Sequence, residues 1–426
     1  MKKNSKNSLN IFPKKGNKPA KAYKAICSEL ALDGNVHLDL GSFSTTVMNS
    51  YADKLILEQI GKNFIDYGEY GQTKKIHDRI IAILSGLLNV PNRKSINGTS
   101  TLGSSEAIHL ALLAHKWNWK KRRQSLNLNT SKPNIVYSGN AHVCWDKFAL
   151  YFDVEPRKIP VSALHSYPLE EILNSIDENT ICVGAIAGNT YTGSIDPIEE
   201  LNSKLSEINS KNNWDIGIHV DAAISGFVLP FLKLHKSQWN FSLPLVRSIN
   251  LSGHKFGLVY PGIGWLIFRD AFFLPKDLIF SSHYLEKPIE TFTLNYSKGA
   301  SMILAQYFSI LQHGISGYKK IIKNCCQIAQ IIREKLSQSD YFEVVDEAIL
   351  PIVVFKLKLN NSIDLNEFQL HLKARNWMLP VYDSPGNFEP EKLMRIVIKE
   401  NFNRAMASHL CDDLINVYQN LNNYRL

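Results

Sequence analysis

The sequence has few cysteines, and their positions do not suggest a metal site or a disulfide framework. Its 426 residues include six cysteines, with no Cys-x-x-Cys pair and no Cys/His cluster. Structural zinc sites and disulfide scaffolds need closely spaced cysteines. We therefore expect no metal ion and a reducing, cytoplasmic location.

Long apolar runs are also missing. A stretch such as "LPIVVF" at 350–355 is far shorter than the roughly 20 residues that cross a bilayer. The N-terminus is basic but has no apolar segment of the kind found in secretory signals. The sequence thus predicts neither a membrane span nor a secretory signal.

Acidic residues are absent from the first 24 positions, which contain eight lysines. The whole chain has a net charge of +9, so the remainder is close to neutral. A basic tail rich in Asn and Ser is typical of a solvated arm. The charge therefore does not indicate nucleic-acid binding as the main function.

Between about 80 and 270, strand-like and helix-like segments alternate, which predicts a mainly parallel α/β sheet covered on both faces. The expected helices are 104–123 and 196–208, the second capped by Asp196 with Pro197 as its first residue. The expected strands are 134–138, 180–188, 215–223, 246–251 and 264–268. From about 326 the pattern changes to a small α+β module. We predict an arm and lead-in segment (1–37), a large domain (38–325) and a small C-terminal domain (326–426).

Four groups of reactive side chains follow strands or begin a helix, where parallel sheets bind ligands. They are Gly103-Ser104-Ser105 before the long helix, His142, Asp221, and Lys255 with its neighbours Ser252 and His254. Each has a simpler structural explanation, such as a helix cap or a solvated lysine. Together they match one cofactor. Pyridoxal phosphate needs a lysine for a Schiff base, an acid facing its ring nitrogen, a phosphate site and a flat group over its ring.

Three segments carry a resemblance to a known family. "GTSTLGSSEAIHLALLAHKWNWKKR", "HVDAAISGFVLPF" and "SGHKFGLVYPGIGW" closely resemble blocks of the glutamate decarboxylases, group II pyridoxal-phosphate decarboxylases of fold type I. The likeness extends from about residue 30 to residue 398. It implies the fold type I large domain, with a sheet of the seven-stranded type, and pyridoxal 5'-phosphate as the cofactor.

The resemblance also implies roles for cofactor-binding residues. Lys255 matches the lysine that binds the cofactor, and Asp221 matches the partner of the ring nitrogen. His142 matches the group that stacks on the ring, and Thr190 a threonine under it. The residues that match phosphate ligands are Ser104, Ser105, Ser252, His254 and, donated across a dimer interface, Ser297.

The catalytic and substrate residues follow from the same resemblance. Tyr284 matches a lid tyrosine that protonates the substrate Cα, and Arg395 matches the arginine near the α-carboxylate. The matches for the distal carboxylate are Ser42, Phe43, Asn63 and Asp66. The sequence departs from the family at Glu286-Lys287-Pro288, at Ile224-Ser225 and at Asp146, which leaves the exact amino acid open.

These residues predict α-decarboxylation of an acidic amino acid, with L-glutamate giving 4-aminobutyrate and CO2. The alternatives are aspartate or cysteine sulfinate as substrate, a decarboxylation-dependent aldehyde synthase, and a cofactor-binding scaffold without turnover. We expect a homodimer or higher homo-oligomer with its active site at the subunit interface.

Overall fold

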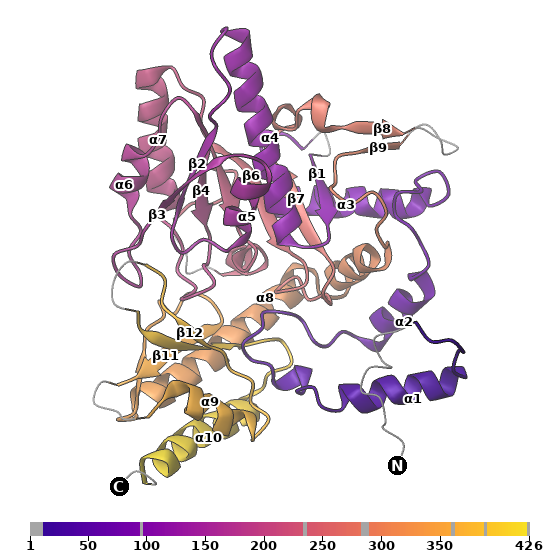
Figure 1. The fold of residues 1–426 in the computed structure, drawn as a ribbon, viewed down its shortest axis with the longest axis vertical. Helices are drawn as coiled ribbons and strands as arrows, with labels where there is room; N and C mark the ends of the chain where they lie inside the picture. The colour runs from indigo at the N-terminus through magenta and orange to yellow at the C-terminus, as the bar shows by residue number, and fades with distance from the viewer. Residues whose placement is uncertain are drawn as a thin grey trace.

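A seven-stranded sheet forms the centre of the molecule (Figure 1). The computed structural model describes residues 12–93, 97–232, 237–282, 289–358, 363–386 and 390–423. The sheet order is β1-β7-β6-β5-β4-β2-β3. The strands are β1 (Gly98–Thr101), β2 (Asn134–Ser138), β3 (Glu155–Ile159), β4 (Thr180–Ile186), β5 (Gly217–Asp221), β6 (Val246–Ser252) and β7 (Gly264–Phe268). The neighbouring pairs β6-β5, β5-β4, β4-β2 and β2-β3 are parallel. Strand β7 is antiparallel to both of its neighbours, β6 and β1. This is the mainly parallel α/β sheet that the sequence predicts.

Helices cover both faces of this sheet, as expected for buried parallel strands. On one face lie α4 (Ser104–Ser125) and α5 (Cys144–Tyr151), which contribute Leu112 and Phe148 to an apolar cluster with β2 and β4. The other face is covered by α3 (Gly71–Leu87), α6 (Leu169–Asn174) and α7 (Ile198–Asn212). Since helices cover both faces, the strands can present polar groups to a ligand only at their ends.

The start of α7 differs from the sequence prediction. The helix begins at Ile198, not at Pro197, and Asp196 does not cap it. The Asp196 carboxylate instead accepts a hydrogen bond from the backbone N–H of Ile186 at 2.7 Å. Burial raises the pKa of Asp196 to about 8. The aspartate is therefore used to close the loop after β4.

A smaller antiparallel sheet lies beside the large one, with the order β10-β11-β13-β12. Its strands are β10 (Phe342–Val344), β11 (Ile352–Leu357), β12 (Val381–Asp383) and β13 (Lys392–Val397). One face packs against α9 (Leu365–Lys373), α10 (Arg404–Asn423) and the end of α8 (Ser301–Ser337). The other face joins the large core through residues such as Ile352 and Val397. Arg395 alternates with Met394 and Ile396, so it lies on the face toward the large sheet.

Helix α8 belongs to both cores. It is interrupted at Gly314, whose φ of 53° lies in the left-handed region that favours glycine. Ile303 and Ile322 pack in the large core, whereas Ile328 and Leu336 pack in the small one. Because the helix runs through residues 325 and 326, the predicted division of the chain at that point stays a prediction.

The N-terminal segments lie along the lower edge of the molecule in Figure 1. Helix α1 (Pro19–Leu30) is described in full and has no buried residue, whereas α2 (Ser50–Gln59) packs against α8. Strands β8 (Phe280–Ser282) and β9 (Ile289–Thr291) pair antiparallel and extend away from the seven-stranded sheet. No helix in the described part of the chain has the length and apolar character needed to cross a bilayer.

Candidate active site

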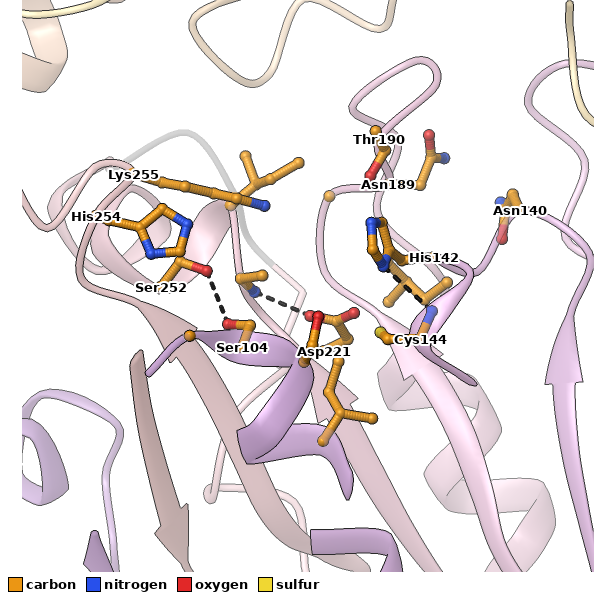
Figure 2. Close-up of a pocket in the computed structure, with 17 residues that line it drawn as sticks. Ser104, Asn140, His142, Cys144, Asn189, Thr190, Asp221, Ser252, His254 and Lys255 are labelled. Atoms are coloured by element: carbon orange, nitrogen blue, oxygen red, sulfur yellow. Dashed lines mark hydrogen bonds between the residues drawn. The ribbon is translucent and has the colours of Figure 1, made fainter. Parts of the chain in front are cut away.

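A cavity of about 180 Å³ opens where strands β4, β5 and β6 end (Figure 2). Its wall combines the N-terminus of α4 with the loops that follow β2, β4, β5 and β6. Of the nine residues predicted to bind the cofactor, eight line this cavity: Ser104, Ser105, His142, Thr190, Asp221, Ser252, His254 and Lys255. Segments far apart in the sequence thus meet at one edge of the sheet.

Lys255 extends across the cavity from the turn after β6, with its amine on the side of Asp221 and His142 (Figure 2). The Lys255 Nζ lies 5.1 Å from the ring centre of Phe43. Burial lowers the pKa of Lys255 to about 8, Asp221 opposes this shift, and Arg395 adds to it. The neutral amine, the form that attacks a carbonyl carbon, is therefore more accessible near neutral pH than in a surface lysine.

The two oxygens of the Asp221 carboxylate have different surroundings. Oδ1 accepts hydrogen bonds from Asn250 Nδ2 at 2.9 Å and from the backbone N–H of Ala223 at 3.1 Å. Oδ2 is contacted by Trp145 Nε1 at 3.5 Å, the long limit of a hydrogen bond. Asp221 is only 5% exposed, and Oδ2 is the oxygen that can still accept a strong hydrogen bond. This asymmetry fits the protonated ring nitrogen of pyridoxal phosphate.

The N-terminus of α4 forms the anion-binding side of the cavity. Ser252 Oγ donates to Ser104 Oγ at 2.8 Å, so two hydroxyls meet where the first N–H groups of the helix lack intrahelical acceptors. A Cβ on Gly264 would lie 2.5 Å from the Gly103 carbonyl carbon, so only glycine allows β7 to pack this close to the helix start. His254 is hydrogen bonded through Nδ1 to the Ile263 carbonyl, which leaves Nε2 for a ligand. Hydroxyls and helix N–H groups together fit a phosphate.

His142 and Thr190 lie across the cavity from Lys255 (Figure 2). His142 Nδ1 accepts a hydrogen bond from the Cys144 N–H at 3.3 Å, which requires that this nitrogen carries no proton. Desolvation of part of the ring lowers the pKa of His142, although the residue is exposed at the cavity mouth. A neutral, flat imidazole at this place can cover a planar ligand.

Phe43 and Arg395 link this cavity to the smaller sheet, to which Arg395 belongs. The Arg395 guanidinium lies 4.6 Å from the ring centre of Phe43, the ring that also contacts the Lys255 amine. Arg395 donates to the carbonyls of Gly41 and Thr190, and its buried Nε has no hydrogen-bond partner among the described residues. Ser42 lies beside Phe43, and its hydroxyl accepts the Ser44 N–H at 3.2 Å. A carboxylate is the natural partner for the unpaired Arg395 donor.

Sequence reasoning missed three residues of this site. Thr45 donates from its N–H to the His254 carbonyl at 2.8 Å and from Oγ1 to the Lys255 carbonyl at 2.7 Å. Asn140 and Asn189 line the cavity and each has a buried amide atom without a partner among the described residues. Both asparagines follow strands at the same edge as Asp221, which is the signal that could have identified them.

Asn63, Asp66 and Ser297 form a second group. Asn63 Nδ2 lies 3.4 Å from Ser297 Oγ, and the Asp66 N–H donates to the Asn63 carbonyl at 3.2 Å. None of these three described residues lines the Lys255 cavity of the same chain. Their predicted contacts with cofactor or substrate stay predictions. Tyr284 and the Glu286-Lys287-Pro288 segment lie outside the described residues.

Known proteins that resemble this chain agree with the cofactor that this geometry fits. Residues 35–358 match the family model described as the pyridoxal-dependent decarboxylase conserved domain. The chain is 42% identical over 404 residues to the glutamate decarboxylase of Petunia hybrida, covering 94% of this chain and 81% of that protein. It is 39% identical over 410 residues to the glutamate decarboxylase of Lactococcus lactis subsp. cremoris (strain MG1363), covering 95% and 88%. The solved structure of Lactobacillus brevis CGMCC 1306 glutamate decarboxylase superimposes with a TM-score of 0.92 at 35% identity, covering 96% of this chain and 94% of that one.

Proposed function

The chain belongs to the pyridoxal-dependent decarboxylase family, and from this premise we propose that it converts L-glutamate to 4-aminobutyrate and CO2. The protein is a pyridoxal-phosphate-dependent carboxy-lyase of fold type I. The observation that carries the choice of glutamate is the identity of about 40% to glutamate decarboxylases over 94% of the chain. The cavity adds support because it joins a desolvated lysine, an open carboxylate oxygen and an anion site.

We propose that different cavity residues hold different parts of the cofactor. The Lys255 amine would hold its aldehyde carbon, and Asp221 Oδ2 would accept a hydrogen bond from its protonated ring nitrogen. The α4 N-terminus with Ser104, Ser252 and His254 would hold its phosphate, and His142 would cover the ring. Pyridoxal phosphate bound here supplies an electron sink for the electron pair left on Cα when CO2 leaves.

The substrate carboxylates need separate binding groups. Arg395 has an unpaired buried donor close to Phe43 and would orient the α-carboxylate. Ser42 would donate a hydroxyl to the distal carboxylate. After CO2 has left, Cα must gain a proton, and Tyr284 is the proposed donor.

We propose that two copies of the chain complete each active site. Two observations support a homodimer. Asn63, Asp66 and Ser297 lie together but do not line their own chain's cavity. Tyr23 and Ile26 of α1 are 70% and 59% exposed on one side of a helix that buries nothing. Exposed apolar helix faces mark interaction surfaces. In the dimer, Asn63 of the partner subunit would donate to the distal carboxylate.

We propose a cytoplasmic location, because the cysteine thiols are free. All six cysteines are free in the structure, and four of them are buried. Buried free thiols are typical of proteins kept in a reducing compartment.

A panel of amino acids tests the substrate assignment. The purified holoenzyme is incubated with glutamate, aspartate, cysteine sulfinate, leucine, tyrosine and lysine, and CO2 and amine are quantified. We expect glutamate to have the highest kcat/KM and Asn63→Ala to raise its KM more than it lowers kcat. Discrimination against analogues without the distal carboxylate can reach ~10⁴ because they leave buried polar groups unpaired. A preference for an aromatic or basic amino acid would refute the distal-carboxylate site.

A further inference from the structure

A buried network of hydrogen bonds continues from Asp221 into the central sheet, on the side away from the cavity. Asn250 Nδ2 donates to Asp221 Oδ1 at 2.9 Å, and His219 Nε2 lies 3.0 Å from Asn250 Oδ1. Ser248 Oγ lies 2.8 Å from His219 Nδ1 and 3.0 Å from His115 Nε2. We call these five residues the sheet network; they come from α4, β5 and β6, and each is at most 5% exposed.

The hydrogen-bonding capacity of each group fixes the direction of the whole network. An ionised Asp221 only accepts, so Asn250 must turn its NH2 toward Asp221 and its Oδ1 toward His219. His219 must then carry its proton on Nε2. Burial lowers the pKa of His219 to about 4, so the ring is neutral and its Nδ1 is an acceptor. Ser248 therefore donates to His219 and accepts from His115 Nε2–H.

Every donor in the sheet network thus points toward Asp221. Such a one-way series polarises each successive hydrogen bond, and it ends on a donor to the carboxylate. Trp145 also fixes the geometry, because its indole packs on the His219 ring at 5.6 Å between ring centres and reaches Asp221 Oδ2.

We propose that His219, Ser248 and His115 are positioning residues that act on Asp221 through Asn250. An asparagine amide can turn by 180° and exchange its oxygen and nitrogen. Against a carboxylate, the reversed amide would place two acceptors together. The Nε2–H of His219 prevents this reversal, so Asn250 occupies Oδ1 as a donor and Oδ2 stays available to the cofactor's ring nitrogen. This inference deepens the proposed function, since it concerns the same cofactor site.

Two amide variants of His219 separate positioning from simple packing. A Gln side chain can place its amide nitrogen where His219 has Nε2, whereas the shorter Asn reaches only the position of Nδ1. We expect His219→Gln to bind pyridoxal phosphate within about threefold of the wild-type affinity. We expect His219→Asn to bind it about tenfold more weakly, because it loses the hydrogen bond to Asn250 Oδ1 that fixes the Asn250 amide as a donor to Asp221. The visible absorption band of the cofactor bound to His219→Asn should also shift relative to that in the wild type.

Asn209→Ala is the matched control. Asn209 is a buried polar residue next to β5, and it exchanges hydrogen bonds with Ile216 at the opposite end of that strand. Its replacement should lower the melting temperature without changing cofactor affinity. Equal cofactor affinity and equal spectra in His219→Asn and the wild type would overturn the proposal.

A measurement on the unsubstituted protein covers the case in which His219→Asn does not fold. Nitrogen-15 NMR of the cofactor-free wild type should show His219 with a protonated Nε2 and an unprotonated Nδ1 at pH 7. The opposite tautomer, or a doubly protonated ring, would refute the proposed direction. Neither readout involves an amino-acid substrate. If the panel showed no glutamate decarboxylation, the proposed function would fail while the sheet network could still be confirmed.

Discussion

Asp221 is the last residue of β5 and Lys255 lies in the turn after the neighbouring strand β6, and the structure gives the two side chains different environments. The Lys255 amine is desolvated and can lose its proton near neutral pH, whereas Asp221 Oδ1 accepts two hydrogen bonds. A ligand between them meets a nucleophile at one end and an anion at the other. At the scale of single residues, this difference in environment is the basis of the proposed chemistry.

The lowered pKa of Lys255 predicts an unusual pH dependence of its reactivity. In the cofactor-free protein, acylation of Lys255 should reach half its maximal rate near pH 8, because the neutral amine increases as pH rises through its pKa. An unperturbed lysine in a short reference peptide should respond near pH ~10.4. Competitive labelling with peptide mass spectrometry measures both. Identical profiles for the two lysines would contradict the burial argument.

The charge on Asp221 predicts a loss of turnover without loss of fold. Asp221→Asn should reduce kcat by ~10²–10³, since a fixed charge that stabilises the transition state is removed. Asp146→Asn is the control, because Asp146 bonds to Tyr137 and Lys158 outside the cavity. The assay is CO2 release at saturating pyridoxal phosphate. Near-normal turnover in Asp221→Asn would mean that another group holds the ring nitrogen.

Some site residues could be predicted from the sequence and others could not. Asp221 is the last residue of β5 and Lys255 lies in the turn after β6, so the apolar strand pattern indicates their place at the sheet edge. Thr45 bonds to the Lys255 carbonyl, more than 200 residues away in sequence, and no local pattern indicates that contact. His219 alternates with apolar residues inside β5 and resembles a core residue until its partners on β6 are known.

At the scale of elements, apolar strands were predicted more accurately than polar ones. The bounds of β2 and β7 agree with the prediction because each contains an unbroken apolar run, "IVY" in β2 and "WLIF" in β7. Strand β1 was not predicted, since its sequence is "GTST" and its burial depends on pairing with β7. Asp196-Pro197 has the composition of a helix start, but tertiary structure uses the aspartate elsewhere. Local pattern fails where a polar side chain bonds to a distant backbone.

Tyr284 stands between strands β8 and β9 in the sequence, in the segment where the family resemblance predicts a lid. Tyr284→Phe should still release CO2 but form aldehyde with uptake of oxygen, because the carbanion at Cα loses its proton donor. An oxygen electrode and product analysis by mass spectrometry test this. Amine yield equal to that of the wild type, without oxygen consumption, would show that Tyr284 does not protonate Cα.

At the scale of the whole molecule, the homodimer proposal predicts complementation between two inactive variants. Lys255→Ala and the double variant Asn63→Ala/Asp66→Ala would each form inactive homodimers. If Lys255 and the Asn63-Asp66 pair of one active site come from different subunits, each mixed dimer has one native site. Equal mixing of the two then restores about a quarter of the wild-type activity.

Mixed dimers are formed by unfolding the two variants together and refolding them. The control is each variant unfolded and refolded alone. Sedimentation of the mixture verifies that dimers have formed. Mixed dimers without recovered activity would show that Lys255 and the Asn63 group act within one chain.

The central claim is that this chain removes the α-carboxyl group of glutamate and replaces it with a solvent proton. The most direct measurement follows L-glutamate labelled with carbon-13 at C1 in D2O, in the presence of the holoenzyme, by NMR. The account predicts labelled CO2 and unlabelled 4-aminobutyrate with one deuteron on the former Cα, in equal amounts. Unchanged glutamate, or release of an unlabelled carbon, would contradict it.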